Sequence, residues 1–189
     1  MSFLDNTKNA GWGLTIIGLL MVLGAIVAIV TSFTGEAEML FKVGGAVIAI
    51  GALLAALAYL KYGNNVRVGN ISDKLEVLGN FVRIVGVTSI LAGLFGVVGS
   101  AIQGNFGGVG TFLVQVILGF IIIWVSKKMM DEKATTFDKI VWIILLVIFV
   151  VELIMGIASL TITGILMALV YLMMLVFLFD GDVKKKMGM

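Results

Sequence analysis

The stretch from Lys139 to Leu160 constrains the fold of this chain more than any other. It reads KIVWIILLVIFVVELIMGIASL, and no polar side chain occurs between Ile140 and Val151. An α-helix rises about 1.5 Å per residue, so about 20 apolar residues cover the roughly 30 Å hydrocarbon core of a bilayer. A single carboxylic acid, Glu152, interrupts this run near mid-depth. The stretch therefore predicts a transmembrane helix that carries an acid inside the membrane.

The composition of the whole chain agrees with a membrane protein. Hydrophobic residues make up 61% of the 189 residues and charged residues only 13%. A soluble domain of this size could not bury so much apolar surface. The chain contains neither cysteine nor histidine, and zinc, haem and iron–sulfur sites lose their usual ligands without them. We therefore expect no metal site and no cofactor, and the net charge of +2 is too small to favour nucleic acid.

Six apolar stretches are separated by short polar or glycine-containing connections. We expect an all-α fold, a polytopic bundle in which a single domain over residues 1–189 holds six transmembrane helices arranged as three hairpins. The predicted spans cover residues 11–33, 40–60, 81–102, 107–126, 140–159 and 162–179.

The basic residues predict the orientation of these spans. All but one of the 13 lysines and arginines fall on one side of the six-span arrangement, and Lys42 is the exception. Cytoplasmic loops carry an excess of lysine and arginine, so both termini are expected in the cytoplasm. The short loops fit a prokaryotic plasma membrane. The basic residues on the cytoplasmic side are Lys8, Lys61, Arg67, Lys74, Arg83, Lys127, Lys128, Lys133, Lys139, Lys184, Lys185 and Lys186.

Two helix starts can be read from local patterns. Apolar residues recur at helical spacing between Ile71 and Val82, which predicts an amphipathic helical turn or two leading into the third span. Such a lead-in could anchor the span at the membrane surface or dock a cytoplasmic partner. Thr135, followed three residues later by Asp138, predicts a capped start for the fifth helix.

Small residues recur one turn apart in several spans. Such stripes let helix backbones approach closely in lipid, where packing drives association. We expect them to pack inside the bundle, and a contact with another subunit is the alternative. The residues are Gly24, Ala28, Gly45, Ala49, Gly51, Ala55, Gly93, Gly96 and Gly99.

Polar residues inside the spans are the candidates for function. A charged carboxylate in mid-membrane costs about 2.5–3.5 kcal/mol on insertion scales, so Glu152 needs a partner or water. Gln115 is the preferred partner, because both residues lie about 12 Å below the outer surface in the six-span arrangement. Thr88 and Ser89 are deeper alternatives. Three roles for Glu152 remain open: a hydrogen bond that locks helices together, a proton- or cation-linked pathway, and a subunit contact.

Residues near the membrane surface have simpler interpretations. Five aromatic residues lie near span ends, where aromatic belts form. They are Trp12, Trp124, Trp142, Tyr59 and Tyr62. The lysines Lys184, Lys185 and Lys186 in the C-terminal tail could attract anionic lipid headgroups, or serve only as a topology anchor.

Enzymatic chemistry finds little support. A histidine-based triad is impossible, no aspartate lies inside a span, and no glycine-rich phosphate loop is present. One buried glutamate is too little for a named reaction, and we expect no enzyme.

Two functions fit these features. The first is a small oligomeric channel or transporter in which Glu152 and Gln115 line a polar path. The second is a non-transporting scaffold, assembly or accessory subunit that binds other membrane proteins. In both, the expected partners are the lipid bilayer and either copies of this chain or other membrane subunits. In length and helix count the chain resembles the substrate-binding components of vitamin-uptake transporters, which dock on a separate ATPase module. This resemblance of layout implies a docking-type component.

Overall fold

The protein is described by a computed structural model that covers residues 2–34, 36–131 and 135–189. All regular elements in these ranges are helices, which confirms the all-α prediction. The basic residue Lys133, used to predict the orientation, lies outside the described residues. The elements are η1 (Phe3–Asp5), α1 (Thr7–Ser32), α2 (Met39–Val68), α3 (Lys74–Ile102), α4 (Phe106–Met129), α5 (Thr136–Ala158), α6 (Ile162–Leu178) and α7 (Gly181–Lys186).

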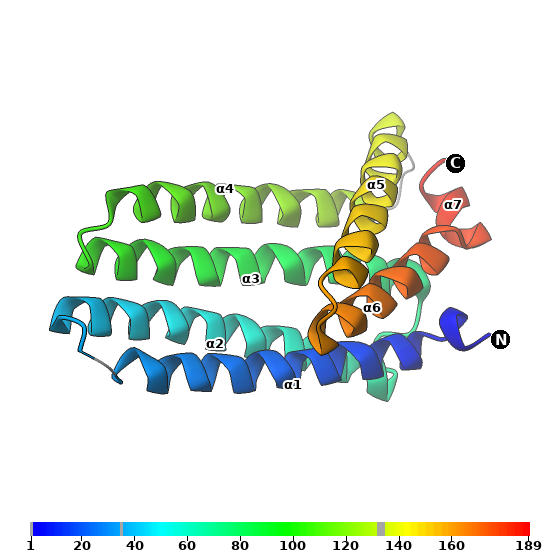
Figure 1. Ribbon diagram of the computed structural model, residues 1–189. Coiled ribbons are helices and arrows are strands. Elements are labelled where there is room, and N and C mark those ends of the chain that lie inside the picture. Colours follow the sequence, from blue (N-terminus) through cyan, green and yellow to red (C-terminus); the bar gives the residue numbers. More distant parts are fainter. Residues whose placement is uncertain (1, 35, 132–134) are drawn as a thin grey trace.

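The helices α1 to α4 lie side by side in chain order, and each is antiparallel to the next (Figure 1). The α1–α2 and α3–α4 connections lie at one end of this four-helix block. The α2–α3 connection and both chain termini lie at the other end, which we call the terminal end (Figure 1).

The hairpin of α5 and α6 runs across the four-helix block near the terminal end, rather than alongside it (Figure 1). α6 packs against α5, α1, α3, η1 and α7, whereas α5 packs mainly against α6. The buried core therefore sits at the terminal end, where Leu14, Phe81, Met174 and Phe177 are at most 1% exposed.

Five of the described helices, α1 to α5, are long and apolar enough to cross a membrane. α6 is apolar as well but has 17 residues, near the lower limit for a span. Large apolar side chains cover the outer surface: Leu23 is 59% exposed, Ile117 59% and Ile154 59%. Water would not tolerate an apolar surface of this extent, whereas lipid does. The chain is an integral, multi-pass membrane protein.

Helix boundaries follow the local capping chemistry. α2 continues through Lys61 to Val68, beyond the predicted span, and ends at Gly69, whose φ of 86° suits a residue without a side chain. The Asp73 side chain accepts a hydrogen bond from the Glu76 backbone N–H at 2.9 Å, so α3 begins at Lys74 and not at Ile71. The predicted cap of α5 is confirmed, because Thr135 and Asp138 form a reciprocal capping box.

Glycines bring the backbones of the four-helix block close together. A Cβ at Gly63 of α2 would lie 2.7 Å from the Thr15 backbone N of α1, and one at Gly18 would lie 2.7 Å from the Leu60 Cα. A Cβ at Gly86 of α3 would lie 2.8 Å from the Gly119 carbonyl oxygen of α4, and the reverse distance is the same. Only glycine permits these approaches, so α1–α2 and α3–α4 are each held by direct backbone contact.

Candidate functional site: an apolar groove between α4 and α5

The two neighbouring helices α4 and α5 barely touch, although both are strongly apolar. Between them lies an apolar cavity of about 360 Å³, which we call the α4–α5 groove. α4 contributes side chains only from its second half, between Ile121 and Val125. The remaining wall comes from α3, α5 and α6, including Val85, Val141, Ile144, Leu145 and Ile148.

Three aromatic rings from three helices form the floor of the groove. Phe81 of α3, Phe149 of α5 and Tyr171 of α6 lie with ring centroids 5.7–6.0 Å apart. Phe81 and Phe149 are 1% and 2% exposed. The Phe81 ring meets the other two edge-to-face, an arrangement that aromatic pairs favour.

A further aromatic pair closes one end of the groove. The Trp124 ring of α4 meets the Phe137 ring of α5 edge-to-face, with centroids 5.0 Å apart. Trp124 lies near the end of α4 and Phe137 near the start of α5, so this pair marks the terminal end of the groove.

Glu152 lies about one turn beyond Phe149, past the opposite end of the groove. It continues the inward stripe of α5, which runs through Val141, Leu145 and Phe149. Those three residues are at most 4% exposed, whereas Glu152 is exposed. This face of α5 is therefore buried as far as Phe149 and exposed from Glu152 onwards.

The structure does not bring Glu152 together with the partners that we predicted for it. Within residues 2–34, 36–131 and 135–189, no hydrogen bond or ion pair reaches its side chain. Gln115 lies more than a turn before the part of α4 that faces α5. Thr88 donates to the Val85 carbonyl oxygen of its own helix at 3.0 Å, and Ser89 is half-buried on α3. The prediction that Gln115 and Glu152 lie at equal depth assumed that α4 and α5 run side by side. In the structure α5 instead runs across α4 (Figure 1).

The predicted packing residues fall into two groups. Gly51 and Ala55 of α2 are buried, and a Cβ at Gly51 would collide with Phe95. Gly93, Gly96 and Gly99 of α3 are buried, and a Cβ at Gly99 would lie 2.5 Å from the Gly44 carbonyl oxygen. Ala49 is buried, and a Cβ at Gly45 would lie 3.2 Å from the Ser32 Oγ.

Gly24 and Ala28 of α1 differ from that group. Both are exposed, and a Cβ at Gly24 would meet no atom within 4 Å. This pair therefore lies on an exposed face of α1 and not inside the bundle.

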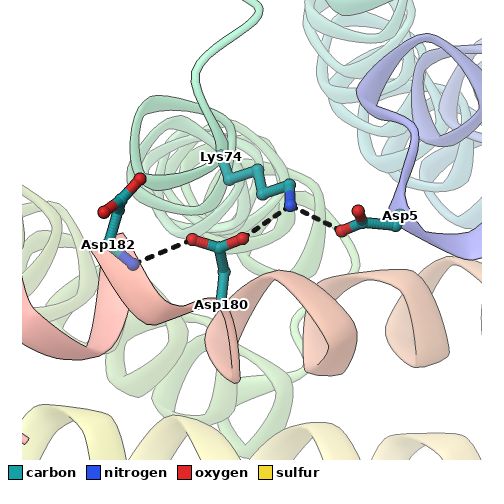
Figure 2. A network of polar contacts seen from close by, with 4 residues as sticks. All are labelled: Asp5, Lys74, Asp180 and Asp182. Atoms are coloured by element: carbon teal, nitrogen blue, oxygen red, sulfur yellow. Dashed lines mark hydrogen bonds and ion pairs between the residues drawn. The ribbon is translucent and has the colours of Figure 1, made fainter. Parts of the chain in front are cut away.

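A polar cluster fastens the two chain ends at the terminal end. Figure 2 shows the Lys74 ammonium between Asp5 and Asp180, at 2.5 and 2.6 Å from their carboxylate oxygens. Asp180 also accepts a hydrogen bond from the Asp182 backbone N–H at 3.0 Å. The hydrogen bond from Lys74 is the main reason why the pKa of Asp180 lies below its ordinary value. The cluster is structural, because it joins η1, the start of α3 and the segment between α6 and α7.

The C-terminal lysines lie next to this cluster, on α7. The Lys184 ammonium lies over the Phe179 ring, 4.9 Å from its centroid. Lys186 lines a polar cavity of about 410 Å³ together with Lys74 and Asp180. Lys185 is exposed on the same short helix.

Sequence reasoning missed the role of Phe149 and Tyr171 in the groove and assigned Trp124, which also lines it, to a surface belt. It also misplaced three aromatic residues outside the groove. Trp142, Tyr59 and Tyr62, which we assigned to a surface belt, are only 4–6% exposed. The Trp142 indole N–H donates to the Leu178 carbonyl oxygen at 2.9 Å, and the Tyr62 hydroxyl donates to the Val77 carbonyl oxygen at 2.7 Å. The available signal was the pair Phe149 and Tyr171, which lie well inside their spans and away from any belt.

The chain was compared with protein-family models, with curated proteins and with solved structures, and no match was found.

Proposed function

We propose that this protein is a non-transporting accessory or scaffold subunit, whose α4–α5 groove receives a transmembrane helix of another membrane protein. One observation carries the proposal: Glu152 is exposed beside an apolar groove and has no polar partner among the described residues.

The chemistry of Glu152 specifies the partner. A lone carboxyl group in contact with lipid is unfavourable by a few kcal/mol, and a hydrogen-bond donor or a cation removes that penalty. Lipid tails offer neither. A second helix that carries a serine, threonine, asparagine, lysine or arginine at the depth of Glu152 offers one, and its apolar face fills the groove.

The proposal includes a membrane arrangement. The helices α1 to α4 cross the bilayer side by side, and the α5–α6 hairpin enters and leaves it on the side of the termini. The position of both termini at one end supports a shared side (Figure 1). The excess of basic residues on that side supports a cytoplasmic location for it. We propose six membrane helices on this basis, with α5 and α6 strongly tilted.

Photo-crosslinking in the native membrane tests the docking of a helix in the groove. A photoreactive side chain is introduced at Ile148, which lines the groove and is 45% exposed. Val147 is the matched control, because it is the preceding residue, is 56% exposed and does not line the groove. Both probes are repeated with Glu152→Leu, and adducts are identified by mass spectrometry.

The proposal expects one membrane protein to be crosslinked from Ile148 through a transmembrane segment with a polar donor. The adduct should be absent from Val147 and at least tenfold weaker with Glu152→Leu. Adducts with lipid alone, adducts with a second copy of this chain, or equal yields from both positions would contradict the accessory role.

A transport function is the second candidate, and the same exposed acid favours it. In a ring of identical copies, Glu152 side chains could line a path between subunits. Proteoliposome flux of the unaltered protein beside Glu152→Gln tests this role. Flux that depends on Glu152 would favour transport. Negligible flux from both the unaltered protein and Glu152→Gln would exclude a transport role.

A further inference from the structure

A second cavity lies between α2 and α3, on residues that the groove does not use. It has a volume of about 410 Å³ and is open to the outside. Its polar lining includes Lys61, Asn65, Asn80 and Arg83, and its apolar lining includes Ala58 and Val87. Two cations and two amides thus share one hollow with apolar side chains.

The two cations lie at similar depth. Lys61 is about 10 Å before the end of α2 at Val68, and Arg83 is about 14 Å after the start of α3 at Lys74. Because α2 and α3 are antiparallel neighbours, both side chains reach the cavity from the same level. Neither forms an ion pair with any carboxylate in the described ranges. Their charges are therefore available to an anion.

The two amides have donor groups to spare. The Asn65 oxygen accepts from the Asn70 side chain at 3.5 Å, and the Asn80 nitrogen donates to the Glu76 carbonyl oxygen at 2.9 Å. An amide nitrogen carries two hydrogens. Each asparagine thus keeps at least one N–H for a ligand, and a group with several acceptor oxygens would satisfy both.

The walls of the cavity are fixed, and its base leads into the membrane. The hydrogen bond from the Tyr62 hydroxyl to the Val77 carbonyl oxygen ties α2 to α3 at the cavity wall. Ala58, Ile84 and Val87 lie further along the helices toward the bilayer centre. The nearest acid on α3, Glu76, precedes Asn80 by one turn and does not line the cavity. The site therefore combines a positive upper part with an apolar lower part.

We propose that this cavity binds the phosphate of an anionic glycerophospholipid from the adjoining leaflet. The phosphate lies between Lys61 and Arg83 and accepts hydrogen bonds from Asn65 and Asn80, while an acyl chain follows Ala58 and Val87. Lysine and arginine at this depth are the residues that attract anionic headgroups. This site is separate from the lysines of the C-terminal tail and does not depend on the occupant of the α4–α5 groove.

Lipid-dependent thermal stability of the purified full chain tests the site. The detergent-solubilised protein is titrated with phosphatidylglycerol, with phosphatidylcholine of the same acyl chains, and with inorganic phosphate, and the increase in Tm is recorded. The test variant is Lys61→Gln/Arg83→Gln. The control is Lys184→Gln/Lys185→Gln/Lys186→Gln, which removes more charge from the same end of the molecule. Unchanged Tm values without added lipid establish that both variants fold.

Phosphatidylglycerol should raise the Tm of the unaltered protein, with the half-saturating concentration increased roughly 25-fold in the double variant and less than threefold in the tail variant. Phosphatidylcholine and inorganic phosphate should have little effect, because the first has no net charge and the second no acyl chain. Equal half-saturation in the two variants, or an equal response to either control compound, would overturn the proposal.

Discussion

In α1–α4 the helices meet backbone to backbone, whereas α4 and α5 are separated by a cavity of about 360 Å³. The difference does not come from hydrophobicity, since α5 is more apolar than any of the first four helices. It comes from side-chain size. Glycines such as Gly18, Gly63 and Gly86 let the first four helices close on one another, while the faces of α4 and α5 that line the groove carry branched and aromatic side chains. In lipid, bulk apolar surface alone does not drive helices together.

The hairpin is nevertheless well packed within itself. A Cβ at Gly156 of α5 would lie 2.7 Å from the Gly164 carbonyl oxygen of α6, and Trp142 is bonded to Leu178. The α5–α6 hairpin is therefore a unit, attached to the block through α6. Under the proposed function, the block is complete by itself and the hairpin is completed by a partner. Each prediction below tests one side of this difference.

The largest effect is expected from Gly63→Ala in the block. The new methyl group would overlap the Thr15 backbone, which cannot move without displacing α1. We expect a loss of about 3 kcal/mol of unfolding free energy, the upper part of the range for overpacked cores. SDS-induced unfolding in mixed micelles measures it.

Gly24→Ala is the matched control on the neighbouring helix. Its methyl group meets no atom within 4 Å, and alanine favours helix more than glycine does. Its stability should be unchanged or slightly higher. Equal losses in the two variants would show that glycine contacts do not distinguish the block.

The second effect concerns Glu152→Leu on the hairpin. Because the side chain is exposed and makes no hydrogen bond in the described part of the chain, leucine should stabilise the isolated protein, by roughly 2 kcal/mol. The same unfolding assay measures the change. A loss of stability would mean that the acid has an internal partner, and the hairpin would then be complete without another protein.

A smaller effect is expected within the hairpin from Trp142→Phe. This variant removes the donor to the Leu178 carbonyl oxygen and retains an aromatic ring. A buried hydrogen bond contributes about 1 kcal/mol, and the lost ring volume adds to that. Thermal unfolding should show a decrease of about 1–2 kcal/mol. An unchanged Tm would indicate that the hairpin is not held at this bond.

The smallest effect is expected at the polar cluster that fastens the chain ends. Since the native pKa of Asp180 is lowered, its pairing stabilises the fold above the unfolded-state pKa and is lost as the pH falls below about 4. The groups are partly exposed, so the contribution should be under about 1 kcal/mol. Unfolding measured from pH 6 to pH 3 should decline less steeply for Asp180→Asn than for the unaltered chain. Parallel profiles would exclude the pair as a source of acid sensitivity.

The existence of the apolar helices could be predicted because length and apolarity are properties of one segment at a time. The 17-residue α6, for example, matches the predicted span 162–179 nearly residue for residue. The cap of α5 was predictable for the same reason, since Thr135 and Asp138 are close in sequence. The end of α2 was not, because Lys61 and Arg67 look like a polar connection although they continue the helix to Gly69.

The groove could not be predicted from the sequence, because it depends on the angle between helices. A side-by-side arrangement places Gln115 opposite Glu152, and a crossing hairpin places Ile121 to Val125 opposite Ile144 and Ile148 instead. The choice between the two arrangements depends on contacts such as Gly13 against Val170, where a Cβ would lie 2.9 Å from a valine methyl. The position of Glu152 as the lone acid of its span was visible in the sequence, but its exposure was not.

Native mass spectrometry of the complex extracted gently from its own membrane tests the central claim most directly, with the unaltered chain and Glu152→Leu side by side. The account predicts that the unaltered chain carries a second, different polypeptide in fixed proportion, and that the leucine variant is released without it although it is the more stable protein. The same species from both chains, whether a monomer, a homo-oligomer or an intact complex, would contradict it.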